Sequence, residues 1–292
     1  MEALPDVAAS SPVGAPRGRC PARSPLGCVF YLTTRCQHRC AHCWLECQPG
    51  EGADMDPAMF SEIVRRAAGR GLLRVVTLTG GEPFIDPDRL LECIRELLAG
   101  HGVLEIFIPT NGLWVLADDY RVLAEELAFI GQFVPYELRI AWSMNRWNLK
   151  QLGRNARPVA QRWRELERRF PQVFRRRTLE REDMLALGRA GASGLARPGA
   201  HLGAHCSFDD WVDPSLGVGF YSDFLAFWPD GSVRACYMAG PVIGSYQEDY
   251  SVLLDKRAAF LWQLRAELTG SPTGILLGTA CSDCAQRIPA DA

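Results

Sequence analysis

Four short apolar runs follow one another along the first half of the chain, and each ends in polar or glycine-rich residues. They span residues 28–34, 74–79, 104–109 and 138–144. Between them, residues 59–68, 89–98 and 120–129 place apolar side chains three and four positions apart, the spacing of an amphipathic helix. Strands and helices that alternate in this way predict βα units and a parallel sheet.

Residues with unusual chemistry come at the ends of these predicted strands. The first run is followed by Cys36, the second by Gly-Gly-Glu-Pro at 80–83 and the third by Asn111, and Ser143 and Asn145 lie at the end of the fourth. In folds of this kind the carboxyl ends of parallel strands meet at one rim, where the chemistry takes place. The pattern therefore predicts a functional site at that rim.

Length and charge limit the classes of function. The chain has 292 residues and a net charge of −2. At ~100–200 residues per domain, this predicts one large domain, or a medium domain with a small one. No run of 18 apolar residues is free of charge, so a membrane span is not expected. The near-neutral balance excludes a chain that is basic throughout and binds nucleic acid.

Composition shifts along the chain predict its organisation. Residues 1–24, rich in Ala, Pro and Ser, are expected to form a disordered leader. Residues 154–189 contain eleven arginines among five acids, which favours a solvated helix face over an anion-binding or partner surface. A Gly/Ala-rich linker at 191–203 leads to a predicted β-hairpin, 224–236, and a helix, 252–268. We expect domains at 25–195 and 196–292.

Eleven cysteines are the most informative feature of the composition. A chain of this size needs no disulfide staples, and residues 1–24 lack the apolar core of a secretory signal, so we expect a reducing, cytoplasmic compartment. Clustered cysteines are then best interpreted as metal ligands. Three of them lie within eight residues: Cys36, Cys40 and Cys43. They suit a four-iron cluster with one iron free of protein ligands, or a zinc ion with Cys47 or a histidine as fourth ligand.

The Cys-x3-Cys-x2-Cys loop followed by Trp44, together with Gly-Gly-Glu-Pro after the second strand, resembles the radical S-adenosylmethionine (SAM) superfamily. The resemblance implies a partial (β/α) TIM-type barrel, a [4Fe–4S] cluster on the three cysteines and SAM on its open iron. It implies that the methionine amine of SAM lies at Gly80, Gly81 and Glu82, and the adenine near Trp44. Further SAM contacts would come from Asn111, Ser143, Asn145 and Arg154, although the family usually has Asp at the position of Asn145.

A second group of cysteines resembles the Twitch domain, a shortened SPASM domain that holds an auxiliary [4Fe–4S] cluster. It combines Gly231 and Cys236 on the predicted hairpin with three more cysteines, Cys206, Cys281 and Cys284. The gap between Cys206 and Gly231 is longer than is usual, which an insertion at 209–223 would explain. A zinc knuckle, or cysteines with separate structural roles, are the alternatives.

The remaining cysteines and the histidines are interpreted as structural. Cys28 and Cys93 lie within a predicted strand and helix, where cysteine acts as a small core residue. Cys20 and Cys47 are left over as well, and the loop histidines, His38, His42, His201 and His205, are expected to support the sites rather than to bind metal.

The resemblance implies an enzyme. An electron from a donor such as flavodoxin or ferredoxin would cleave SAM reductively, and the 5′-deoxyadenosyl radical would remove a hydrogen atom from the substrate. An auxiliary cluster would then accept an electron, which makes the protein an oxidoreductase. We expect a small-molecule substrate of natural-product biosynthesis. The alternatives are a peptide-modifying maturase and a non-enzymatic metal scaffold. Candidate substrate contacts are Trp142, Trp147, Asp209, Asp210 and Tyr221.

Overall fold

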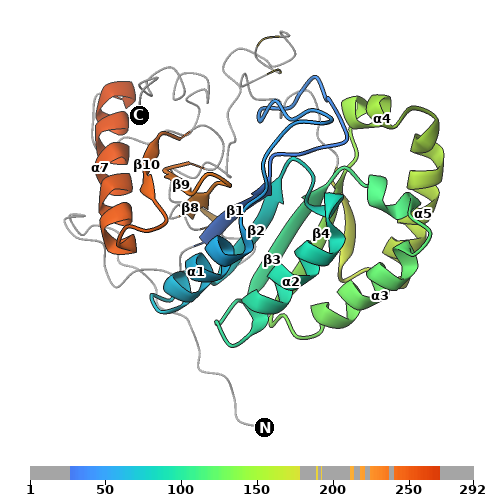
Figure 1. Ribbon diagram of the computed structural model, residues 1–292, viewed down its shortest axis with the longest axis horizontal. Coiled ribbons are helices and arrows are strands. Elements are labelled where there is room, and N and C mark those ends of the chain that lie inside the picture. The colour runs from blue at the N-terminus through green and yellow to red at the C-terminus, as the bar shows by residue number, and fades with distance from the viewer. Residues whose placement is uncertain are drawn as a thin grey trace.

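An eight-stranded sheet forms the centre of the molecule, in the order β10-β9-β8-β1-β2-β3-β4-β5 (Figure 1). The computed structural model describes residues 27–177, 189, 192, 211–213, 218–220, 224–236 and 240–269. The neighbouring strands from β8 to β5 run parallel, whereas β9 and β10 are antiparallel to their neighbours. The strands are β1 (Gly27–Thr33), β2 (Val75–Gly80), β3 (Glu105–Thr110), β4 (Glu137–Ser143), β5 (Phe174–Arg177), β8 (Phe224–Phe227), β9 (Ser232–Arg234) and β10 (Val242–Ser245). A separate antiparallel pair consists of β6 (Trp211–Asp213) and β7 (Val218–Phe220).

Helices follow the strands and pack on one face of the sheet (Figure 1). Two of them begin in the same way: Asp56 and Asp86 each accept a hydrogen bond from a backbone N–H of the first turn and are followed by proline. The helices are α1 (Pro57–Ala68), α2 (Pro87–Leu98), α3 (Tyr120–Gly131), α4 (Arg146–Leu152), α5 (Ala156–Arg169) and α7 (Tyr250–Thr269), with 3₁₀ turns η1 (Pro83–Ile85), η2 (Leu113–Leu116) and η3 (Gly153–Asn155). None of the described helices is long and apolar enough to cross a membrane.

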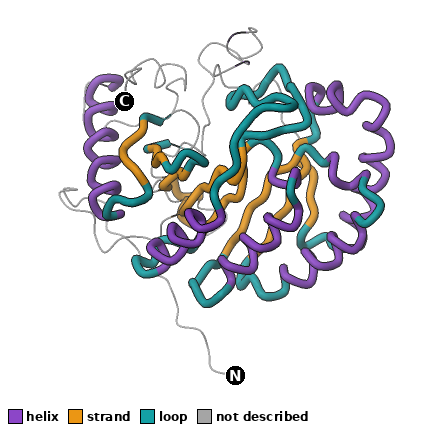
Figure 2. Tube along the Cα trace, in the orientation of Figure 1, coloured by secondary structure: helices purple, strands orange, loops and turns teal. Residues whose placement is uncertain are grey.

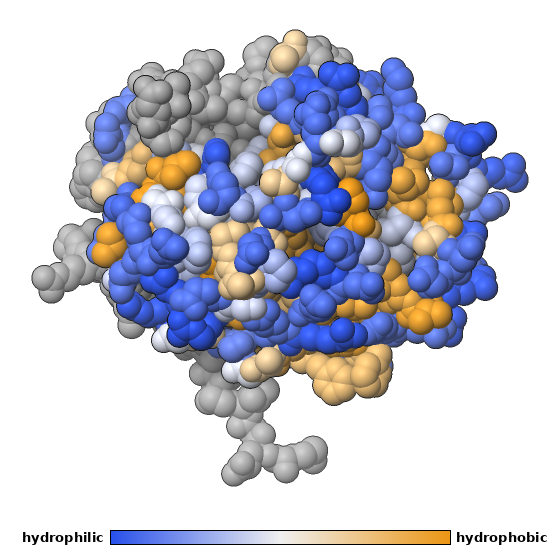
Figure 3. All heavy atoms as spheres, in the orientation of Figure 1, coloured by the Kyte–Doolittle hydropathy of each residue, from blue (hydrophilic) through white to orange (hydrophobic). Residues whose placement is uncertain are grey.

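The two faces of the sheet carry different side chains because alternate strand residues point to opposite sides. The face under the helices is apolar and closed, and includes Val76, Leu78, Ile106, Ile108, Leu138 and Ile140. The opposite face, half-buried in the part of the chain described, includes Thr77, Thr79, Phe107, Arg139 and Ser143. We call these the helix face and the inner face. On the outside of α1 and α2, hydrophilic side chains predominate (Figure 3).

The predicted hairpin is present, and it extends the same sheet. β8 pairs in parallel with β1, and β9 pairs antiparallel with β8. The hairpin and the parallel strands therefore share one sheet, although the sequence placed them in separate domains. The boundary at 195/196 stays a prediction, because residues 193–210 lie outside the described part, as do residues 1–24.

The first four predicted strands and the helices α1, α2, α3 and α7 are confirmed to within two residues. Periodicity missed α4, and the described residues 154–177 of the arginine-rich segment include α5 and the edge strand β5. In α5 the apolar side chains Val159, Trp163 and Leu166 are buried, while the arginines stay at the surface. The interpretation as a solvated helix face is thus confirmed for this helix.

Candidate functional site

The loop between β1 and α1 carries the three closely spaced cysteines. It lies at the carboxyl end of the sheet beside α4, in blue in Figure 1, where the loops of the first strands gather (Figure 2). Two contacts hold it there: Arg39 N–H donates to Gln151 Oε1 at 3.2 Å, and Asn148 Nδ2 lies 3.4 Å from His38 Nδ1. At its base, Thr33 and Arg35 both donate to Asp54. We refer to residues 34–56 as the cysteine loop.

Gly80 and Gly81 allow the end of β1 and the start of the cysteine loop to lie against the end of β2. A Cβ on Gly80 would stand 1.9 Å from the Thr33 carbonyl oxygen, and one on Gly81 would stand 2.1 Å from that of Arg35. Gly80 also has a φ of +135°, which L side chains rarely adopt. The two backbones lie so close together that both positions require glycine, because any side chain would force the strand ends apart.

Glu82 joins the ends of β2 and β3. Its Oε1 accepts from Thr110 Oγ1 at 2.7 Å and from Phe84 N–H at 3.1 Å, and its Oε2 accepts from Asn111 N–H at 2.6 Å. The side chain is 1% exposed, and this burial raises its pKa to about 7 against the opposing pull of the three donors. The carboxylate therefore fixes the rim through contacts within the protein.

Asn111 connects the rim to the cysteines. Its Nδ2 lies 3.9 Å from Cys36 Sγ and 3.2 Å from Gln37 Oε1, while its Oδ1 accepts from Leu113 N–H. The structure thus brings Cys36, Glu82 and Asn111 together, as the positions of their strands predicted.

The end of β4 meets the cysteine loop through asparagines. Asn145 caps α4, since its Oδ1 accepts from the N–H groups of Trp147 and Asn148, while its buried Nδ2 has no partner among the described residues. Asn148 accepts from Trp142 Nε1 and reaches His38. The sequence analysis did not single out Asn148 or Gln151, because an amide on an amphipathic helix carries no distinguishing signal.

The proposed substrate contact Trp142 is wrong for this structure, because its ring is fully buried on the helix face against Trp163. Trp147 is buried as well, stacked under Arg146. Arg154 is exposed on η3 and makes no hydrogen bond or ion pair with the described residues. Ser143 is half-buried on the inner face, and Asp209, Asp210 and Tyr221 lie outside the described residues.

Trp44 belongs to an aromatic group at the end of β1. Its ring lies edge-on to Tyr31 at 5.8 Å and to Trp228 at 6.3 Å. The rings of Tyr31 and Trp228 stack on each other at 4.4 Å. The group forms an apolar surface beside the cysteine loop, on the inner face of β1 and β8.

The thiols of the loop differ in acidity. Burial raises the pKa of Cys36 to about 11 and that of Cys40 to about 12. The hydrogen bond from Cys47 lowers the pKa of Cys43 to about 6. Cys47, buried and 6% exposed, is thus a direct neighbour of a predicted ligand. Cys28 and Cys93 are fully buried core residues, as predicted.

The loop histidines, His38 and His42, support the structure of the loop and do not add to its predicted cysteine ligands. Burial lowers the pKa of His38 below its ordinary value. Burial, with the nearby charge of Arg189, lowers the pKa of His42 to about 4, and the His42 ring packs against Trp147 at 5.4 Å. Both imidazoles are therefore neutral near pH 7.

Arg189 contacts the cysteine loop, and the sequence analysis missed it because it is one of many arginines in the arginine-rich segment. Its backbone N–H donates to the Cys43 carbonyl oxygen at 3.1 Å. Its side chain donates to the carbonyl oxygens of Cys40, Glu46 and Cys47. One residue from far along the chain thus binds the cysteine loop at four main-chain oxygens.

Of the second group of cysteines, the described residues include Cys236 alone. Cys206, Cys281 and Cys284 lie outside the described part. Cys236 is buried beside α7, where Arg257 Nε donates to the neighbouring Ala235 carbonyl oxygen at 2.9 Å. Arg234, two residues earlier, is level with Val29 in the sheet. Because β9 runs antiparallel to β1, Cys236 lies toward the amino end of β1, about 20 Å of strand from the cysteine loop.

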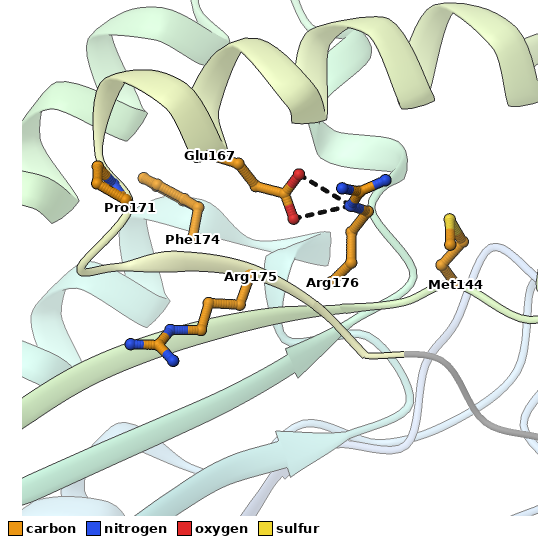
Figure 4. Close-up of a pocket in the computed structure, with 6 residues that line it drawn as sticks. All are labelled: Met144, Glu167, Pro171, Phe174, Arg175 and Arg176. Carbon is orange, nitrogen blue, oxygen red and sulfur yellow. Dashed lines mark hydrogen bonds and ion pairs between the residues drawn. The ribbon is translucent and has the colours of Figure 1, made fainter.

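A pocket of about 540 Å³ lies between α5 and the edge strand β5 (Figure 4). Its charged groups are paired: Arg176 binds Glu167 at 2.8 Å, and Arg175 binds Glu137 of β4 at 3.2 Å. It contains none of the predicted site residues, and its lining is Met144, Glu167, Pro171, Phe174, Arg175 and Arg176.

Comparison with known proteins agrees with the geometry of the rim. Residues 30–132 match the family model described as Radical SAM superfamily. This part of the chain is similar to radical SAM domains. It contains the cysteine loop, the glycine pair, Glu82 and Asn111, and it covers about a third of the chain.

Curated relatives are similar to a part of this chain that is under a third of its length. A GTP 3′,8-cyclase from Chlorobaculum tepidum is 33% identical over 82 residues, which is 28% of this chain and 24% of the relative. A putative peptide biosynthesis protein from Bacillus subtilis, YydG, is 30% identical over 86 residues, 30% of this chain and 26% of the relative. The match therefore spans about a quarter of each relative.

A solved structure extends the likeness in fold beyond this domain. The crystal structure of BtrN in complex with AdoMet and 2-DOIA aligns with a TM-score of 0.54 over 82% of this chain and 86% of that one. The identity is 14%, so this likeness concerns the fold. The eight-stranded, mostly parallel sheet of this chain is consistent with a partial TIM-type fold.

The residues at the rim fit a [4Fe–4S] cluster and SAM. Among the described residues, no three potential ligands converge on a single metal ion. Cys36, Cys40 and Cys43 nevertheless lie on one short loop, and three thiols there are a donor set for a four-iron cluster with one iron free of protein ligands. The unpartnered Nδ2 of Asn145 is a buried donor that an acceptor on a bound molecule would satisfy.

Proposed function

We propose that this protein is a radical SAM enzyme that removes a hydrogen atom from a small-molecule substrate in natural-product biosynthesis, followed by oxidation through an auxiliary [4Fe–4S] cluster. When bound, the first cluster and SAM supply reductive cleavage of SAM and the 5′-deoxyadenosyl radical. The observation that carries the proposal is the joining of four strand ends to one cysteine loop by Glu82, Asn111 and Asn148.

Each of these residues has a positioning task in the proposal. Cys36, Cys40 and Cys43 would hold the cluster, and their protons must leave when iron binds. Glu82 keeps β2 and β3 in register at the rim, so the backbone of Gly80 and Gly81 is held ready for the methionine amine of SAM. Asn145 would donate its Nδ2 to SAM, and Trp44 would offer an apolar surface for the adenine.

Support for a small polar substrate comes from the inner face. Beside the rim it presents Thr79 and Ser143, and deeper in the sheet it presents Arg139, all half-buried. Such a lining suits a hydroxylated or charged molecule, because each polar group of the substrate could replace a hydrogen bond to water.

A peptide substrate is the second candidate, and the similarity to YydG favours it. A peptide could pair with an edge of the sheet, as peptides do in β-augmentation. β5 is an edge strand in the described sheet. Its side chains Arg175 and Arg176 are already paired with acids, so this edge offers main-chain groups more readily than free charges.

The auxiliary cluster is assigned to Cys206, Cys236, Cys281 and Cys284. Cys236 and the cysteine loop lie toward opposite ends of β1. An auxiliary cluster there would act as an electron acceptor, and not as a ligand of the substrate atom that reacts. The net reaction would then be a two-electron oxidation.

The test is iron and sulfide content after anaerobic reconstitution. We expect about eight irons per parent chain and about four in a Cys281→Ala/Cys284→Ala variant. Cys93→Ala serves as the matched control, since Cys93 is a fully buried core residue of α2. Four irons in both parent and variant would remove the auxiliary cluster and the oxidation from the proposal. Stoichiometric zinc with little iron would overturn it entirely.

Substrate class is tested by the fate of SAM. With dithionite as reductant, the reconstituted parent should convert SAM to methionine and 5′-deoxyadenosine, and Cys43→Ala should not. Candidate substrates deuterated at their C–H positions, small polyols and amino sugars on one side and peptides on the other, then report by transfer of deuterium to 5′-deoxyadenosine. Transfer from peptides alone would replace the small-molecule assignment by the second candidate.

A further inference from the structure

Arg189 makes contacts that a solvated surface arginine would not need. Its backbone and side chain bind the carbonyl oxygens of Cys40, Cys43, Glu46 and Cys47. The Nε–Cys40 and Nη1–Glu46 bonds measure 3.0 and 2.7 Å. These oxygens span the loop from the second predicted ligand to Cys47. The loop is therefore closed by a residue that lies more than 140 positions away in the chain.

A guanidinium is suited to this task in a way that an ammonium is not. It presents five N–H donors in a fixed planar fork, and here they reach three carbonyl oxygens from three different peptide groups. A lysine could bind these oxygens only one or two at a time from a flexible chain. Charged hydrogen bonds of this kind each contribute more than neutral ones, so the loop loses most of its freedom.

The positive charge of Arg189 also lies beside the loop cysteines. Its guanidinium donates to the main-chain oxygens of Cys40 and Cys47, which flank Cys43 in the loop. A cluster held by three thiolates carries net negative charge, and its reduction adds one more. Net charge and hydrogen bonding near a cluster set its reduction potential.

We propose that Arg189 is a positioning residue that holds the cysteine loop closed around the iron–sulfur cluster and favours its reduced state through its positive charge. The inference rests on the proposed function for the identity of the cluster. It goes beyond that function in assigning a separate role to a residue that is not a predicted iron ligand and binds main-chain oxygens of the loop.

The test compares Arg189→Gln and Arg189→Lys with the matched control Arg162→Gln. Arg162 also donates to two carbonyl oxygens, of Val115 and Ala117, but does so on the helix side of the sheet. Three quantities are measured: amide hydrogen exchange of residues 36–47 in the iron-free protein, the rate of iron loss to a chelator, and the cluster reduction potential by EPR-monitored titration.

Arg189→Gln should raise exchange in the loop about tenfold or more, since charged hydrogen bonds are lost. It should also hasten iron loss and make the potential more negative, by about 59 mV for a tenfold change in the ratio of oxidised to reduced cluster. Arg189→Lys should keep the potential near that of the parent but not the slow exchange, because it restores the charge without the planar fork. Arg162→Gln should change none of the three.

Equal values for Arg189→Gln and Arg162→Gln would overturn the inference. An unchanged potential with faster exchange would reduce Arg189 to a purely mechanical clamp and overturn the electrostatic part. A parent chain that binds no iron would overturn the proposed function instead, and the exchange measurement, which needs no iron, would still decide whether the clamp exists.

Discussion

The helix face and the inner face of the sheet are made by alternate residues of the same strands, yet they are held by different forces. On the helix face, Ile106, Ile108 and Ile140 are fully buried among side chains from α1, α2, α3 and α5. On the inner face, Arg139 is half-buried, ion-paired with Glu137 and positioned over the ring of Phe107. The first face is stabilised by packing, and the second by hydrogen bonds and charge.

The difference separates stability from chemistry within one sheet. Apolar packing depends on volume and tolerates no gap, whereas the rim depends on the direction of individual donors and acceptors. Mutations on the helix face should therefore lower the free energy of unfolding and leave the cluster site intact in whatever protein remains folded. Mutations at the rim should do the reverse, with modest losses of stability and large losses of iron or SAM binding.

The largest effect on stability is expected from Trp163→Ala. The Trp163 ring is fully buried and lies within about 6 Å of the rings of Trp114, Trp142 and Phe174. Its removal leaves a cavity that rigid neighbours cannot fill, so unfolding by urea should show a loss of about 3–5 kcal/mol. Val122→Ala, at a position 67% exposed on α3, is the control and should stay within about 0.5 kcal/mol.

Measuring the iron content of the Trp163→Ala protein that remains folded tests whether packing on the helix face and binding at the rim are independent. If Trp163→Ala lowered iron stoichiometry in protein that is still folded at 10 °C, the two faces would be coupled and the separation would be wrong.

Gly81→Ala should come next. The new methyl group would stand 2.1 Å from the Arg35 carbonyl oxygen, so β2 and the cysteine loop must separate. We expect a loss of about 3 kcal/mol and failure to retain iron after reconstitution. Gly69→Ala is the matched control, because its Cβ would make ordinary contacts at 3.7 Å. Full iron retention in Gly81→Ala would mean that the rim tolerates displacement.

Glu82→Gln tests the rim without changing its shape. An amide NH₂ in place of Oε2 would face the N–H of Asn111, and two donors cannot bond each other. The loss should be about 1–2 kcal/mol in chemical unfolding, and affinity for SAM should fall as the rim shifts. Glu96→Gln on α2, where the carboxylate accepts from Ser61, is a partly buried control away from the rim.

The difference in stability between the parent and Glu82→Gln should change with pH in one direction. Burial raises the pKa of Glu82 from 4.5 to about 7, so the folded chain binds the proton more tightly than the unfolded chain. The stability that this group contributes is fully present below pH 4.5 and is lost as the pH rises to about 7. The stability gap between parent and Glu82→Gln should therefore narrow across this interval. A stability difference that grows with pH would show that the three hydrogen bonds lower the pKa of Glu82 more than burial raises it.

The smallest effect is expected for Arg139→Gln on the inner face. Its partners Glu137 and Glu105 are partly exposed, at 20% and 34%, so water already weakens these ion pairs. The loss should be about 1 kcal/mol or less, and it should shrink in 1 M salt. A loss as large as that of Trp163→Ala would contradict the weak contribution expected of partly exposed ion pairs.

Sequence patterns predicted the parts of the molecule that depend on local periodicity. The alternation in 74–79 and 104–109 located β2 and β3, and the spacing of Cys36, Cys40 and Cys43 located the loop. The partners of these residues were not predictable, because Asn148, Gln151 and Arg189 are ordinary polar residues until the fold brings them to the loop. Trp142 was misassigned because an aromatic side chain near a rim has the same sequence signature whether it faces the core or a substrate.

β1 lies in the middle of the sheet but belongs to the beginning of the chain. Gly27 pairs with Val75 on one side and with Phe224 on the other, and Arg66 of α1 binds the carbonyl oxygens of Tyr246 and Glu248. During synthesis at ~5–20 residues per second, β1 must wait roughly 10–40 s for its second neighbour to leave the ribosome. Throughout that time the three thiols are already made while one edge of their supporting strand is open. The strand that leads into the cysteine loop is thus paired on both sides only after β8 is complete.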